Sequence, residues 1–219
     1  MKLFKVFISA ILAGILIGVG GIVYVAYSTT SAFIAALLFS FGLFTIIMTG
    51  VHLYTGKVGY VFEQKPLYIG ELLIIFVGNI IGSGLMGILI HFTRFSDKYK
   101  EVIKGICDTK LNDNLLSIFI LSILCGIMIY LAVDVSKKLT SGFQKTFAIS
   151  IPVIIFILSG FEHVIANAFY FAASFTFTSK MLLYILIMAV GNALGSIAIW
   201  GLQKLITDNN KTTNNESDN

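Results

Sequence analysis

A six-residue motif occurs twice in this chain, each time inside the third member of a group of three long apolar stretches. The motif reads GNIIGS at 78–83 and GNALGS at 191–196, 113 positions later. Because three stretches separate the copies, the second copy must cross a bilayer in the opposite sense to the first. The repeat therefore predicts two inverted three-helix halves, an arrangement that many transporters and channels share.

The composition supports a membrane protein and excludes a soluble globule. Hydrophobic residues make up 57% of the chain, charged residues only 12%, and the mean hydropathy is +0.93. A helix needs roughly 20 apolar residues to cross the hydrocarbon core of a bilayer. Six stretches meet this length, at 6–27, 31–52, 67–92, 115–133, 146–171 and 181–203.

We therefore expect an all-α integral membrane protein with six transmembrane helices in an aquaporin-like inverted repeat. Residues 1–205 are predicted to form one channel domain. The polar segment 206–219 has no apolar periodicity and is predicted to be a disordered tail.

The distribution of basic residues predicts how the chain is oriented in a cell membrane. If the N-terminus is cytoplasmic, nine Lys or Arg residues lie on the inner side and six on the outer side. This bias places both termini of a multi-pass protein in the cytoplasm. The net charge of +4 suits an anionic inner leaflet and requires no nucleic acid partner.

Two of the six stretches contain features that an uninterrupted helix avoids. In the second stretch, 49–57 reads TGVHLYTGK, and in the fifth, Pro152 precedes SGFEH at 159–163. Backbone groups freed by a helix break cannot face lipid, so they lie in protein or line a cavity. Paired breaks in matching positions of two repeats predict a central binding site.

Ionisable and amide side chains within the apolar stretches are the candidate functional groups. For Glu162 we favour a structural role as an ion-pair or capping partner, since an acid repels an anion. For His163 we favour exposure to a pore, where imidazole donates a hydrogen bond to an anion. For Asn79 and Asn192 we favour hydrogen bonds between helices or to broken backbone over pore lining.

Metal, cofactor and enzyme chemistry are not expected. The three His and two Cys residues lack metal-ligand spacing. Cys107 is predicted in the outer loop and Cys125 within the fourth stretch, so we do not expect them to form a disulfide. No nucleophile or nucleotide-binding loop accompanies Glu162 and His163, as a membrane enzyme would require.

These motifs together resemble the formate/nitrite transporter family. The segment SGFEHVIAN at 159–167 resembles the family's Gly-Phe-Glu-His-x-x-Ala-Asn signature, and LYTG at 53–56 is similar to its Leu-Phe-Thr-Gly loop segment. The two Gly-Asn-x-x-Gly motifs also match, and the resemblance covers 6–205. It implies a homopentamer with one pore per protomer, which passes small monovalent anions such as formate, nitrite and hydrosulfide.

The resemblance also implies roles for individual residues of the pathway. Lys110 matches the vestibule lysine, His163 the central histidine and Thr55 a residue facing the central chamber, and Asn167 belongs to the same signature. The matching constrictions are Leu53 and Tyr54 on the inner side, and Phe39, Leu43 and Phe156 on the outer side. Two positions depart from the family: Gly126 replaces an asparagine, which predicts an altered chamber, and His52 replaces an acidic residue, which predicts altered gating of the loop.

The sequence therefore predicts a channel that passes a small weak-acid anion, formate or nitrite before hydrosulfide. An apolar constriction disfavours a bare charge, so transient protonation of the anion lowers the cost of crossing. The residues leave open whether His163 gives up the proton or stabilises an anion protonated by water. The alternative is an aquaporin-like pore for small neutral solutes, although the chain lacks that family's Asn-Pro-Ala signals.

Overall fold

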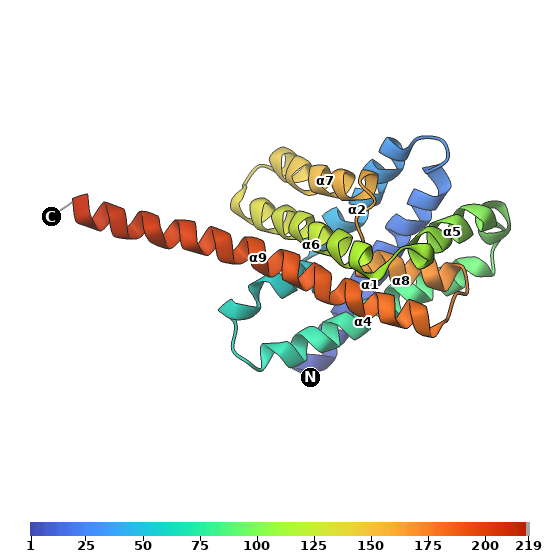
Figure 1. Ribbon diagram of the computed structural model, residues 1–219, viewed down its shortest axis with the longest axis horizontal. Coiled ribbons are helices and arrows are strands. Elements are labelled where there is room, and N and C mark those ends of the chain that lie inside the picture. Colours follow the sequence, from blue (N-terminus) through green and yellow to red (C-terminus); the bar gives the residue numbers. More distant parts are fainter. Residues whose placement is uncertain (218–219) are drawn as a thin grey trace.

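The computed structural model describes residues 1–217, with side chains described through residue 207. Within this range the fold is entirely helical (Figure 1). The helices are α1 (Lys2–Tyr27), α2 (Ala32–Thr49), α3 (Tyr54–Lys57), the short 3-10 helix η1 (Val58–Glu63), α4 (Tyr68–His91), α5 (Arg94–Asn112), α6 (Leu115–Lys138), α7 (Gly142–Leu158), α8 (Val164–Ala173) and α9 (Ser179–Ser217).

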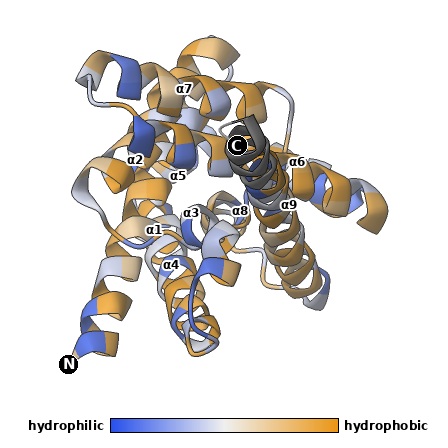
Figure 2. Cartoon of the chain, turned by 90° about the vertical axis from the view of Figure 1, so that its left-hand side faces the viewer, coloured by the Kyte–Doolittle hydropathy of each residue, from blue (hydrophilic) through white to orange (hydrophobic). Residues whose placement is uncertain are grey.

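Five helices are long and apolar enough to cross a membrane: α1, α2, α4, α6 and the part of α9 up to Thr207. They follow the predicted stretches closely, and the fifth stretch, 146–171, is divided between the shorter apolar helices α7 and α8. Large apolar side chains such as Phe41, Leu73 and Leu186 are exposed on the outside of the bundle. Figure 2 shows that hydrophobic residues make up most of the long helices, as expected of a protein surrounded by lipid.

The two copies of the repeated motif form equivalent helix contacts. Helix α4 packs against α1, and a side chain at Gly82 would collide with the carbonyl of Ile11. Helix α9 packs against α6 in the same way, and a side chain at Gly195 would collide with the carbonyl of Ile123. Small residues allow this close approach of two helix backbones. The glycines of the motif are therefore packing positions.

Gly126 lies in the same kind of contact, and the altered chamber expected from this departure stays a prediction. A Cβ atom at this position would overlap the backbone carbonyl of Asn192. Gly14 meets the carbonyl of Asn79 in the equivalent way in the other helix pair. As packed, α6 and α9 leave no room for a Cβ atom at 126, so the glycine is a position of close helix contact.

The segment between α4 and α6, which contains none of the predicted apolar stretches, is the amphipathic helix α5. Thr93 caps its N-terminus by accepting a hydrogen bond from the Phe95 amide, and Ile103 and Cys107 are buried. Burial raises the pKa of the Cys107 thiol, and Cys107 and Cys125 are both free cysteines. The last turn of α5 carries Lys110.

Helix α9 extends to Ser217 and so runs into the segment 206–219 for which the sequence predicts disorder. The side chains from residue 208 onward, and residues 218–219 entirely, lie outside the described part of the chain. The disordered tail stays a prediction.

Both predicted helix breaks are present, and each contains a glycine in the left-handed conformation. Gly50 ends α2 with φ +71°, and Gly160 follows α7 with φ +68°. Only glycine adopts this region without strain from a Cβ atom. Pro152 lies inside α7, so it does not mark the break. After the breaks the chain re-enters the bundle as α3 and as α8, which lie near its middle in Figure 2.

Candidate functional site

The Asn79 side chain holds the break between α2 and α3. Its Oδ1 accepts a hydrogen bond from the Tyr54 amide at 2.7 Å. Its Nδ2 donates to the carbonyls of His52 at 2.9 Å and Ala10 at 2.7 Å. One buried amide thus satisfies backbone groups that the helix break leaves without helical partners.

The Asn192 side chain makes the equivalent set of bonds at the break between α7 and α8. Its Oδ1 accepts from the Val164 amide at 3.0 Å. Its Nδ2 donates to the carbonyls of Ser122 at 2.7 Å and Glu162 at 2.8 Å. Asn79 therefore ties the first break to α1, and Asn192 ties the second break to α6.

The two breaks meet at a contact between Thr55 and His163. Thr55 Oγ1 lies 2.9 Å from His163 Nε2, and the two residues are only 1% and 2% exposed. His163 also caps α8, because its Nδ1 accepts a hydrogen bond from the Ala166 amide at 3.2 Å. An Nδ1 that accepts leaves the proton of a neutral imidazole on Nε2, which donates to Thr55. The Thr55 hydroxyl hydrogen is then free to donate elsewhere.

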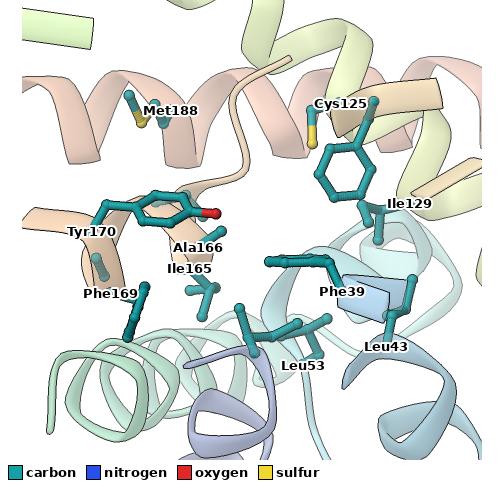
Figure 3. Close-up of a cluster of buried hydrophobic side chains, with 14 of the residues drawn as sticks. Phe39, Leu43, Leu53, Cys125, Ile129, Ile165, Ala166, Phe169, Tyr170 and Met188 are labelled. Atoms are coloured by element: carbon teal, nitrogen blue, oxygen red, sulfur yellow. The ribbon is translucent and has the colours of Figure 1, made fainter. Parts of the chain in front are cut away.

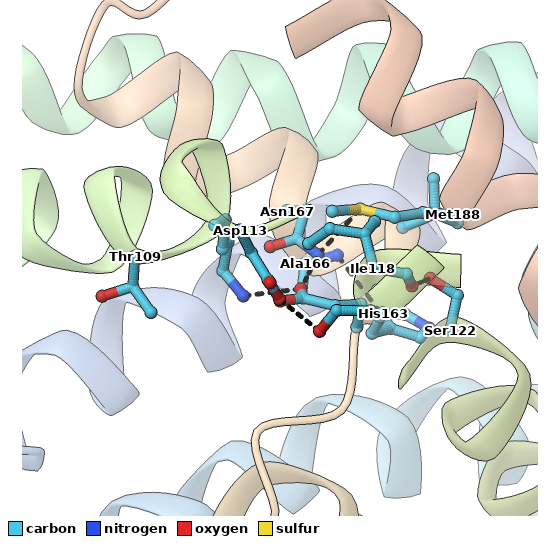
Figure 4. Close-up of polar contacts among 12 residues, drawn as sticks. Thr109, Asp113, Ile118, Ser122, His163, Ala166, Asn167 and Met188 are labelled. Carbon is cyan, nitrogen blue, oxygen red and sulfur yellow. Dashed lines mark hydrogen bonds and ion pairs between the residues drawn. The ribbon is translucent and has the colours of Figure 1, made fainter. Parts of the chain in front are cut away.

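A charged cluster lies next to this contact. Lys110 Nζ forms an ion pair with Glu162 Oε2 at 2.6 Å, and Asn167 Nδ2 donates to the same oxygen at 2.7 Å. Asn167 Nδ2 also lies 3.1 Å from the sulfur of Met188 (Figure 4). The Asn167 Oδ1 atom is buried and has no hydrogen-bond partner among the described side chains. A buried acceptor without a partner marks a place where a small donor can bind.

Two cavities approach the Thr55 and His163 contact. The outer cavity, of about 80 Å³, is lined by His163, Lys110 and Asn167 together with aromatic rings. The inner cavity, of about 500 Å³, is lined by Leu53 and Gly56, which lie two positions before and one position after Thr55. Thr55 is buried between the residues that line the two spaces.

Apolar side chains surround the same point. The rings of Phe39 and Phe156 line the outer cavity and meet edge to face with centroids 6.1 Å apart. Phe156 also stacks on the His163 imidazole at 5.9 Å. Figure 3 shows Phe39, Leu43 and Leu53 gathered in one cluster. Apolar groups therefore surround the contact between Thr55 and His163.

The structure brings together most of the residues selected from the sequence, with two differences in placement. Leu43 lines the inner cavity, although the resemblance grouped it with Phe39 and Phe156 on the outer side. The Tyr54 hydroxyl donates to the Ala189 carbonyl at 3.2 Å, and its ring packs against Phe76. Tyr54, which the resemblance placed at the inner constriction, therefore packs against α4 and α9 and is not among the residues that line either cavity.

Sequence reasoning missed several residues that line the cavities. Tyr24 and Tyr170 line the outer cavity, and Lys57, Tyr60 and Lys137 line the inner one. Tyrosines are common at membrane interfaces, and the two lysines served only to predict orientation, so no local signal distinguished them. These residues line the cavities because the fold brings together segments that are far apart in the sequence.

His52 lies inside the first break and is bound to α1. Its Nδ1 lies 2.9 Å from the Ser9 hydroxyl, and its amide donates to the same oxygen at 3.1 Å. Two contacts to one serine fix the loop to α1. Among the described residues, no group of three or more His, Cys, Asp or Glu side chains could hold a metal ion.

A bundle of long apolar helices, with two broken helices that meet at a buried polar contact between cavities, defines a multi-pass membrane protein of the channel and transporter class. Residues 1–206 match the sequence model of the family described as Formate/nitrite transporter. The chain belongs to this family.

Similar proteins of known sequence include bacterial and parasite transporters. The chain is 28% identical over 183 residues to the Formate channel FocA of Escherichia coli (strain K12), a match that covers 75% of this chain and 64% of FocA. It is 28% identical to the Uncharacterized transporter YrhG of Bacillus subtilis (strain 168), over 80% of this chain and 71% of YrhG. The chain thus spans somewhat less than two thirds of the length of FocA.

Two solved structures have the same fold. A pentameric formate channel with formate bound superposes with a TM-score of 0.79 at 21% identity, covering 94% of this chain and 97% of that chain. An FNT family ion channel superposes with a TM-score of 0.84 at 21% identity, covering 93% and 90%.

Proposed function

We propose that this protein is a channel for a small monovalent weak-acid anion, formate or nitrite first and hydrosulfide as a further substrate. The observation that carries the proposal is the buried contact between Thr55 and His163, which lies between an outer cavity bearing Lys110 and an inner cavity bearing further lysines. Membership of the formate/nitrite transporter family and the similarity to FocA support the same substrate class.

We further propose six membrane spans in two inverted three-helix repeats, with α7 and α8 together forming the fifth span. The matching contacts of Asn79 and Asn192 across equivalent helix pairs support this arrangement. Both termini lie in the cytoplasm, as the distribution of basic residues indicates. The protein assembles as a homopentamer, in keeping with the similar pentameric formate channel.

The path of the anion begins at Lys110, whose positive charge raises the local anion concentration. Glu162 accepts the ammonium and the Asn167 amide, so the carboxylate is occupied by donors and the lysine is held beside the outer cavity. The Phe39 and Phe156 rings follow, where a neutral acid crosses at far lower cost than a bare anion.

The hydrogen bonds of His163 favour hydrogen-bond donation over proton donation. Nδ1 is occupied by the Ala166 amide, so taking up a second proton there would require breaking the cap of α8. The neutral ring presents one N–H, on Nε2, toward Thr55. We therefore assign His163 and Thr55 to stabilising an anion that is protonated by water in the vestibule.

Uptake into proteoliposomes tests the proposal. Formate, nitrite and hydrosulfide are compared in parallel at about pH 5.5 and about pH 7.5, since a weak acid is protonated more at the lower pH. Selective flux that rises at the lower pH is expected. Passage of water or glycerol without flux of any of the three anions would instead identify the aquaporin-like pore for neutral solutes.

A further inference from the structure

The inner cavity has features of a binding site that the pathway described above does not use. It occupies about 500 Å³ between the C-terminal end of α2, the α3 and η1 segment and the C-terminal end of α6. Its charged lining residues are Lys57, Lys137 and Glu63. Its apolar part includes Leu43, Ile46, Ile47, Val51, Leu53 and Val133.

The two lysines of this cavity have no carboxylate partner in the part of the chain whose side chains are described. The ion pairs there join Lys2 to Glu71, Lys110 to Glu162 and Lys138 to Asp134. The cavity therefore holds two cations and one carboxylate, Glu63, and its net positive charge attracts an anion from solution.

The carboxylates that act on these two lysines, Glu63, Glu71 and Asp134, each have another donor. Glu71 pairs with the Lys2 ammonium at 3.7 Å. Asp134 accepts from Lys138 and from the Tyr60 hydroxyl. Glu63 accepts from the Trp200 indole N–H at 2.6 Å. Lys137 lies over the Tyr60 ring, with its nitrogen 3.7 Å from the ring centroid. This contact positions the ammonium group and leaves its charge uncancelled.

The cavity also borders the segment that carries Thr55. Leu53, which is 2% exposed, and Gly56 line it, and Thr55 lies between them in sequence. Lys57 follows Gly56 at the end of α3. An anion held by the lysines would therefore stand one apolar barrier away from the Thr55 and His163 pair.

We propose that Lys57 and Lys137 form an inner anion-binding site, where a small monovalent oxyanion such as formate lies between the two ammonium groups before it passes Leu53. The site is the inner counterpart of the one at Lys110, and it rests on the proposed function. It supplies the anion to the pathway from the side of α3 and sets the concentration at which transport from that side saturates.

Sided flux measurements test this site. Formate flux is measured from each face of proteoliposomes in which the protein orientation is determined by access to a tag at the C-terminus. In the Lys57→Gln, Lys137→Gln double variant, the half-saturating formate concentration rises by about 10-fold on the cavity side at low ionic strength and is unchanged on the other side. High salt reduces the difference, because it screens exposed charges.

Three further variants separate a site from a general surface charge. Lys65→Gln removes an exposed charge near the same face but outside the cavity, and it leaves saturation unchanged. Lys137→Arg keeps the charge and the wild-type value, and Glu63→Gln lowers the half-saturating concentration. An equal rise in Lys65→Gln and in the double variant, or equal rises on both faces, overturns the proposal.

The single tryptophan of the chain provides a readout that does not depend on transport. Trp200 is bonded to Glu63, which lines the cavity, so formate binding should change the indole emission. We expect a saturable change with sodium formate, measured against sodium chloride at equal ionic strength, that the double variant loses.

The two readouts separate failure of the site from failure of the function. If wild-type protein passes no formate yet shows the saturable emission change, the proposed function fails and the inner site stands. If wild-type protein transports formate while both the emission response and the sided saturation are the same in the double variant, the inner site is wrong and the channel function stands.

Discussion

The two helix breaks use the same asparagine clamp but differ in how firmly the following segment is packed. All ten residues of α8 are buried, and its N-terminus is capped by His163. The segment of α3 and η1 buries only Thr55, Val58 and Gly59, and it borders the 500 Å³ inner cavity. Segments with few buried contacts open at lower free-energy cost than fully buried ones. We therefore expect the α3 side to open more readily than α8.

The largest effect is expected from substitutions in the clamps themselves. Asn192→Leu leaves the Val164 amide and two carbonyls without partners in a buried site, at a cost of about 3 kcal/mol of stability. Asn79→Leu costs less, because the Tyr54 and His52 groups that it bonds are only partly buried. Thermal unfolding of the purified protein in detergent measures both.

Equal losses of thermal stability in the two asparagine variants would break the comparison between the two breaks. A conservative control is Asn192→Asp, which as a neutral acid keeps the acceptor for Val164 and one of the two donors. It should fall between wild type and Asn192→Leu.

The second prediction concerns the contact between α6 and α9, next to the break between α7 and α8. Gly126→Asn introduces the family's usual residue where a Cβ atom overlaps the Asn192 backbone, and it should cost about 3 kcal/mol or prevent assembly. Gly105→Asn, in α5, is the matched control, because nothing lies within 4 Å of the added Cβ atom. Size-exclusion profiles and thermal unfolding distinguish them. Wild-type stability in Gly126→Asn would show that the contact between α6 and α9 can open.

The third prediction tests the contact between Thr55 and His163, where the two breaks meet. Thr55→Val keeps the shape but leaves the buried His163 N–H without an acceptor, so formate flux should fall by about 10-fold. Thr55→Ser restores the acceptor and should recover most of the flux. His163→Asn removes the imidazole and should change both the rate and its pH dependence. An unchanged rate and pH profile in His163→Asn would exclude a role for the ring in handling the protonated acid.

The smallest effect is expected where Ser9 of α1 binds His52, in the break between α2 and α3. Ser9→Ala removes the hydroxyl that meets both the His52 ring and its amide, at a cost of about 1 kcal/mol. The loss should appear as faster amide hydrogen exchange confined to 50–57, since this segment opens most readily. Exchange that increases equally in α8 would contradict the contrast between the two breaks.

The sequence predicted the helices well because the bilayer imposes simple local rules. The predicted stretch 67–92 corresponds to α4 at Tyr68–His91, and the predicted breaks near 50–57 and 159–163 are present. Length and hydropathy decide whether a segment can cross hydrocarbon, and both can be read from the segment alone. The apolar stretches do not include α5, because the charges of 94–112 mask its periodic apolar face.

The candidate site was predictable as a set of residues but not as an arrangement. The signature around His163 and the Leu53–Gly56 segment came from sequence, as did the choice of Asn79 and Asn192. Their contact depends on atoms that lie 108 positions apart in the chain, such as Thr55 Oγ1 and His163 Nε2. No local pattern encodes such a distance.

What the sequence determined by itself is the membrane environment, the number and limits of the apolar stretches, the repeat and the family. Tertiary structure alone decided that Gly126 is a packing position, that Leu43 lines the inner cavity and that Lys57 and Lys137 share that cavity. The physical reason is the range of the interactions. Hydrophobic transfer acts on each segment independently, whereas steric fit, hydrogen bonds and shared cavities depend on which segments the fold brings together.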